Sequence, residues 1–276
     1  MLSQLESMLL HGGILACTIA ALLALLGLFW PKRFGLAPTN VTTAAAFLAF
    51  LGYFLSRFVT SGAVPLANVF EVMLLIASGL ILGYFIVLLK RPHPALAAWV
   101  LPMAGVILFA ALPLGSILGP ASVDTERSDS VNNPLILAHV VLAIMATVHF
   151  AFAFLVASMF LLQDRALKLK RDSVAVRALP PLEVLERMVF AGVAGGFAML
   201  TLALGLGFAA EWDDLGAWLT RPKVIASLAM WLVFLMVVAG RYNHRFRGRR
   251  EMYLVMTGFL IVIIVYAYSA TMAGGT

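Results

Sequence analysis

Five histidines are the residues of this sequence best suited to bind a metal ion or a cofactor, and two of them stand in one apolar segment. His139 and His149 are ten residues apart, so on a helix they lie ~15 Å apart along the axis and project within about 80° of each other. They can face one cavity, but they cannot share one small ion. A neutral imidazole is tolerated in an apolar helix and is a good axial ligand for haem iron. The alternative is a histidine that makes only a structural hydrogen bond.

A third histidine, His244, follows another apolar segment in the sequence Gly-Arg-Tyr-Asn-His-Arg-Phe-Arg-Gly-Arg-Arg. The arginines around it suit carboxylate groups such as haem propionates, or they anchor the chain to anionic lipid. His11, at the start of the first apolar segment, and His93, between two prolines, are expected to be solvated or interfacial.

Two further groups of residues are candidates for a binding site. Asn68 and Glu71 have the i, i+3 spacing that places both on one helix face, which is also the spacing of a helix capping box. Trp212 belongs to Glu-Trp-Asp-Asp-Leu-Gly-Ala-Trp, residues 211–218. It is either an aromatic floor for a flat macrocycle or an anchor at a membrane interface.

The elements that position these residues follow from the composition. The 276 residues are 63% hydrophobic and 12% charged, whereas a soluble domain carries roughly 25% charged residues. The mean hydropathy is +1.02. Long apolar runs predict an all-α fold, a polytopic membrane bundle of about eight transmembrane helices in one domain, residues 1–276. The expected spans are 8–30, 42–60, 68–89, 95–118, 134–162, 188–210, 223–243 and 252–273. Pro180-Pro181 predicts a break, then a short amphipathic helix leading into the sixth span.

Charge in the connecting segments alternates along the chain. Numbered along the chain, the first, third, fifth and seventh gaps between the expected spans hold most of the lysines and arginines. The fourth gap holds Asp124, Glu126 and Asp129, and the sixth holds Glu211, Asp213 and Asp214. The positive-inside rule therefore places both termini outside and the basic gaps in the cytoplasm. The net charge of +6 is dispersed among these gaps, so it indicates membrane topology and the lipid bilayer as a partner, not nucleic acid.

Known catalytic signatures are absent from the sequence. It contains no Walker lysine loop, no His-Glu-x-x-His and no Gly-x-Ser-x-Gly, and Cys17 has no partner for a disulfide. We therefore expect a protein that is not an enzyme. The scarcity of charge within the apolar segments also disfavours a small-solute transporter.

The order of these features resembles the cytochrome c assembly family, which includes the CcsA and CcmC haem-handling membrane proteins. The resemblance rests on three stretches: Trp231-Leu-Val-Phe with Arg241 to Arg250, Pro134-Leu-Ile-Leu-Ala-His139-Val, and Pro65 to Glu71. It runs over most of the chain and is strongest from residue 134 onward. Pro-Pro-Leu-x-x-x-Glu-Arg before the sixth span resembles the shorter HemX-like and YpjD-like branch. The dense tryptophan motif of the haem exporters is reduced here to Trp212 and its neighbours, and their second external histidine is missing.

The resemblance implies a haem-handling protein of the bacterial plasma (inner) membrane that binds or delivers haem with partner subunits of cytochrome c assembly. It implies His139 as a ligand on the outer face and His244 as a ligand on the cytoplasmic side, with Trp212 at the outer rim. The remaining candidates for the haem site are Asn68, Glu71 and His149. The alternative is a scaffold or regulatory protein of haem biosynthesis or respiratory assembly that binds no haem.

Overall fold

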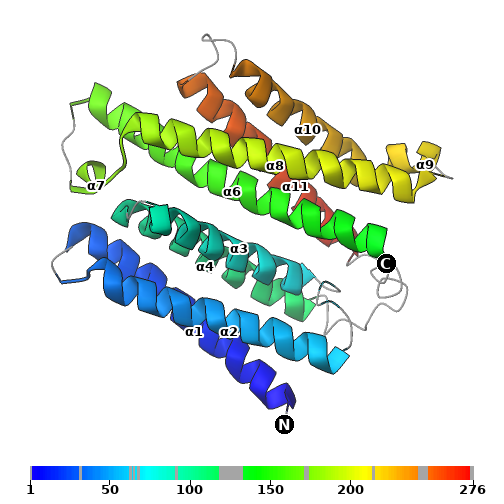
Figure 1. Cartoon of the computed structure of the whole chain (residues 1–276), viewed down its shortest axis with the longest axis horizontal. Helices are drawn as coiled ribbons and strands as arrows, with labels where there is room; N and C mark the ends of the chain where they lie inside the picture. The colour runs from blue at the N-terminus through cyan, green and yellow to red at the C-terminus, as the bar shows by residue number, and fades with distance from the viewer. Residues whose placement is uncertain are drawn as a thin grey trace. The chain divides into compact units, whose positions relative to one another are not determined.

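In the computed structural model, every regular element of the described residues is a helix (Figure 1). The structure describes residues 2–30, 33–61, 64, 66, 69–90, 93–117, 133–170, 174–212, 215–241 and 248–273. This result confirms the all-α class predicted from the long apolar runs.

The helices group into two compact units. The first unit comprises residues 1–131 and 170–180 and contains α1 (Leu2–Phe29), α2 (Leu36–Ser61), α3 (Val69–Lys90), α4 (Pro94–Ile117) and the single turn α7 (Val174–Arg177). The second unit comprises residues 132–169 and 181–276 and contains α6 (Pro134–Lys168), α8 (Leu182–Ala210), the short α9 (Leu215–Thr220), α10 (Pro222–Gly240) and α11 (Arg249–Ala273).

Six of the described helices are long and apolar enough to cross a membrane: α1, α2, α3, α4, α6 and α8. The apolar part of α10 is shorter, Val224–Gly240, and α11 has 25 residues. These two helices stand where the seventh and eighth spans were expected. Large apolar side chains are widely exposed, for example Leu89 at 88% and Val59 at 75%. Because water disfavours such a surface, the chain is a multi-pass membrane protein. The placement of the termini outside and the single domain stay predictions.

The segment after Pro180-Pro181 is helical, as predicted. Leu182 begins one continuous helix of 29 residues with Pro181 as its N-cap, so the expected short amphipathic helix and the sixth span form a single helix. Proline is compatible with a helix start because the first N–H groups have no intrahelical acceptor. The prolines therefore lie between the single turn α7 and the beginning of α8. At the start of α6, the Asn133 side chain accepts a hydrogen bond from the Leu135 N–H at 3.0 Å.

The first unit encloses a polar contact as well as apolar side chains. Tyr84 of α3 is completely buried, and its hydroxyl donates a hydrogen bond to the Asn40 side-chain oxygen of α2 at 2.6 Å. Because a buried hydroxyl needs a partner, this bond fixes the position of α3 against α2.

The core of the second unit contains two stacked phenylalanine rings. Phe150 of α6 and Phe234 of α10 are both fully buried, with ring centroids 3.7 Å apart and an interplanar angle of 1°. A Cβ at Gly196 of α8 would lie 2.7 Å from the Phe150 ring, and one at Gly258 of α11 would lie 2.9 Å from the Phe234 ring. Two glycines thus flank the ring pair, and the four long helices of the second unit, α6, α8, α10 and α11, meet at this stack.

Candidate functional site

The histidines of α6 lie in a closely packed helix pair. A Cβ at Gly192 of α8 would lie 3.2 Å from the Cβ of Ala153 and 3.3 Å from the carbonyl oxygen of His149. Gly192 and Gly196 have the spacing of a Gly-x-x-x-Gly motif, which lets two membrane helices approach closely. Sequence reasoning did not single out this motif, although the spacing is visible in the sequence.

His139 is half-buried near the start of α6, and its ring contacts the backbone of α8. Its Nδ1 lies 2.6 Å from the carbonyl oxygen of Ala203. A carbonyl oxygen only accepts, so Nδ1 carries the proton, and in the neutral ring Nε2 keeps its lone pair. Within the described residues Nε2 has no hydrogen-bond partner. Histidines that ligate metals usually have this arrangement, with the second ring nitrogen donating to a carbonyl or carboxylate oxygen.

His149 has the same proton arrangement but a different partner. Its Nδ1 donates to the carbonyl oxygen of Met145 on its own helix at 2.9 Å. The ring packs against α8, where a Cβ at Gly195 would lie 2.8 Å from His149 Cδ2 and 3.2 Å from Nε2. The absence of a side chain at Gly195 therefore makes room for this imidazole.

The two histidines meet α8 at different heights. His139 contacts Ala203 and His149 contacts Gly195, so α6 and α8 run antiparallel, and the contacts are about 12 Å apart along α8. Both rings lie against the same helix, but they cannot bind one metal ion together.

Trp212 lies just beyond the end of α8 and is 63% exposed. Its ring packs edge-on against Phe208, with centroids 5.2 Å apart. Phe208 is about 140° around α8 from Ala203, on the side where Thr201 accepts a hydrogen bond from Trp231 of α10 at 2.9 Å. Trp212 and His139 thus share one end of the helix pair but are associated with different sides of α8.

Two of the predicted site residues, Asn68 and His244, lie outside the described residues. The last described residue before His244 is Arg241, whose guanidinium pairs with Glu186 at 3.3 Å and lies 4.4 Å from the centre of the Phe190 ring. Two contacts with α8 therefore fix the end of α10.

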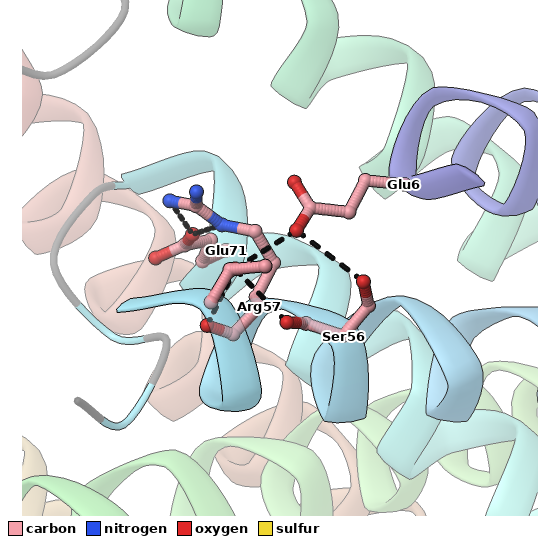
Figure 2. Close-up of polar contacts among 5 residues, drawn as sticks. Glu6, Ser56, Arg57 and Glu71 are labelled. Atoms are coloured by element: carbon pink, nitrogen blue, oxygen red, sulfur yellow. Dashed lines mark hydrogen bonds and ion pairs between the residues drawn. The ribbon is translucent and has the colours of Figure 1, made fainter. Parts of the chain in front are cut away.

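Glu71, also predicted as a site residue, lies in the first unit as part of an ion pair. Its carboxylate is fully buried at the start of α3 and accepts hydrogen bonds from Arg57 at the end of α2, from Nη2 at 3.1 Å and from Nε at 3.3 Å (Figure 2). Beside this pair, Glu6 of α1 accepts hydrogen bonds from Ser56 at 3.3 Å and Thr60 at 2.9 Å.

Sequence reasoning missed this ion pair because it considered Glu71 only together with Asn68, on its own helix. The signal was present: opposite charges at the facing ends of two consecutive apolar segments have few other partners in a membrane. The pair connects the end of α2 to the start of α3.

No group of three or more His, Cys, Asp or Glu side chains suited to a metal ion occurs among the described residues. A porphyrin brings four nitrogen ligands of its own, so haem iron needs only one or two axial ligands from protein. His139, with its anchored Nδ1 and accessible lone pair, fits that requirement.

The fold and these residues define a multi-pass helical membrane protein with an anchored histidine at one end of a tightly packed helix pair. The chain belongs to the cytochrome c assembly protein family, whose model matches residues 66–275. This match confirms the resemblance seen in the sequence.

Several curated proteins are similar to the chain at low identity. The cytochrome c biogenesis protein CcsA of Synechococcus sp. strain WH7803 is 24% identical over 295 residues, with 95% of this chain and 91% of the relative covered. CcsA of Prochlorococcus marinus subsp. pastoris is 22% identical over 233 residues, which cover 77% of this chain and 73% of the relative. Protein HemX of Brevibacillus brevis is 26% identical over 221 residues, covering 77% of this chain and 76% of the relative.

Proposed function

We propose that this chain is a non-catalytic, haem-handling protein of the bacterial plasma (inner) membrane that acts in cytochrome c assembly. His139 is the ligand to haem iron on the outer face in this proposal. Membership of the cytochrome c assembly family and the similarity to CcsA proteins support the general role. The observation that carries the assignment of the ligand is the 2.6 Å contact of His139 Nδ1 with the Ala203 carbonyl oxygen.

The chemistry of His139 supports a ligand role in two ways. The hydrogen bond to Ala203 keeps the ring in the tautomer whose Nε2 lone pair is available, and it makes that nitrogen more basic. It also holds the ring direction, so less conformational freedom is lost when a ligand binds. When bound, haem supplies an iron atom that accepts an imidazole nitrogen; the chain binds and orients it.

The other predicted residues have supporting roles in this proposal. His244 is a ligand on the cytoplasmic side, and Trp212 contributes to the outer rim. His149, Asn68 and Glu71 are the remaining candidates for contacts with haem. Partner subunits of the assembly machinery supply the second external ligand that the sequence lacks.

Haem titration of the purified full-length chain tests the proposal. We expect a Soret band that saturates at a defined stoichiometry in the wild-type protein, and a weakened and shifted band in His139→Ala. His11→Ala is the matched control, because His11 also donates from Nδ1 to a carbonyl oxygen, that of Ser7 at 2.7 Å, but it is exposed on α1. Its spectrum should equal that of the wild type.

Two outcomes of the titration would exclude His139 as an iron ligand. If wild-type protein shows no saturable Soret band, or if the two variants give the same spectrum, His139 is not an iron ligand. A chain that co-purifies with its partners while giving no band would instead be the scaffold or regulatory protein named as the alternative.

A further inference from the structure

One end of the second unit carries a cluster of charged residues where α6 and α11 meet. Asp164, near the end of α6, lies 2.8 Å from the Lys168 ammonium and 4.0 Å from Arg249 Nε at the start of α11. Arg165 follows Asp164 in the sequence, and Arg250 follows Arg249. We call these five residues, Asp164, Arg165, Lys168, Arg249 and Arg250, the basic seam. Its four cations and one anion give a net charge of +3.

Most other described cations at this end of the unit have acidic partners. Arg187 pairs with Glu183 at 3.5 Å, and Arg241 pairs with Glu186 at 3.3 Å. Arg165 and Arg250, by contrast, are exposed, and their side chains have no ion pair or hydrogen bond within the described part of the chain. The basic seam therefore presents two uncompensated guanidinium groups.

An apolar stripe continues from the basic seam along α11. Tyr253, Leu260 and Ile264 are 49%, 50% and 66% exposed, and they follow Arg250 by 3, 10 and 14 residues. At 100° per residue these positions lie within about 80° of Arg250 on the helix surface. On α6, the exposed Leu162 lies one turn before Arg165. The surface formed by α6 and α11 is thus cationic at the basic seam and apolar along α11.

We propose that the basic seam binds the phosphate of an anionic phospholipid, with Arg165 and Arg250 as the principal contacts and an acyl chain along the α11 stripe. Guanidinium groups suit phosphate oxygens because they donate parallel hydrogen bonds. The stripe distinguishes a lipid from free phosphate, since only a lipid covers apolar surface. Charge alternation assigns this end to the cytoplasmic side, where anionic lipids attract basic residues. The inference does not depend on haem binding.

Reconstitution of the full-length chain tests this inference. Protein is placed in nanodiscs that contain phosphatidylcholine with about one fifth phosphatidylglycerol, and retained lipids are counted by native mass spectrometry after detergent extraction. Enrichment of phosphatidylglycerol is expected to fall about fivefold in Arg165→Gln and in Arg250→Gln. Arg187→Gln is the control, because it removes the same charge at the same end from a residue already paired with Glu183.

Each other outcome overturns the proposal. Equal losses in all three variants would indicate a general surface-charge effect, and no enrichment in wild-type protein would mean that no lipid site exists. If millimolar inorganic phosphate displaces the retained lipid completely, the seam is a site for free anions.

Discussion

Replacing Gly196 with alanine tests the packing that holds the two α6 histidines against α8. The new Cβ would lie 2.7 Å from Phe150 Cε1, whereas ordinary van der Waals contact begins at 3.4 Å. Movement of the Phe150 ring is restricted because it is fully buried and stacked on Phe234, which in turn lies against Gly258. Overpacking of this kind costs about 1–3 kcal/mol.

Gly205→Ala is the matched control on the same helix, because a Cβ there meets no atom within 4 Å. Helix propensity alone makes alanine more favourable than glycine at such a position by up to about 1 kcal/mol. Because both glycines lie within α8, this propensity gain is common to the two variants, which should therefore differ in the free energy of unfolding by the overpacking cost of about 1–3 kcal/mol. Equilibrium unfolding in mixed micelles measures this difference.

A compensating substitution at Phe150 tests directly whether the contact between Gly196 and Phe150 causes the loss of stability. Phe150→Leu should relieve the overlap, so Gly196→Ala with Phe150→Leu should lose less stability than the two single changes added together, by about 1 kcal/mol. If Gly196→Ala is as stable as Gly205→Ala, or if the effects of Gly196→Ala and Phe150→Leu simply add, Phe150 does not pack tightly against Gly196.

Two predictions concern polar contacts in the first unit. Arg57→Gln should destabilise the chain by about 3 kcal/mol, because the fully buried Glu71 carboxylate loses its cation, and adding Glu71→Gln should recover most of that loss in thermal unfolding. A double variant as unstable as Arg57→Gln would show that the pair is not coupled. Tyr84→Phe should cost about 1 kcal/mol by removing the 2.6 Å hydrogen bond to Asn40; a melting curve unchanged from the wild type would refute this contribution.

The sequence predicted the helices well because apolar runs of this length have few other solutions in a membrane. The expected span 68–89 corresponds to Val69–Lys90, and the expected span 95–118 corresponds to Pro94–Ile117. Hydropathy placed the start of the sixth span at residue 188, although α8 begins at Leu182, because Glu183 and Arg187 give its first turns a polar surface. These turns extend the helix beyond the apolar segment.

The contacts of the candidate site were harder to predict than the helices. His139 was a candidate because a neutral imidazole is tolerated in an apolar helix and is a good axial ligand for haem iron, yet the partner of its Nδ1 is a backbone oxygen 64 residues away, at Ala203. Backbone acceptors carry no sequence signal. The Arg57–Glu71 pair depends in the same way on how two helix ends meet, which spacing along the chain does not determine.

The most direct test of the central claim is imidazole rescue of a His139→Gly variant loaded with haem. We expect this variant to lose the histidine-ligated spectrum and added imidazole to restore it, while His149→Gly responds less to imidazole. Free imidazole can replace a missing ligand but cannot repair a general folding defect. Loss of the spectrum without rescue, or a His139→Gly spectrum identical to that of wild-type protein, would contradict the assignment of His139 as the iron ligand.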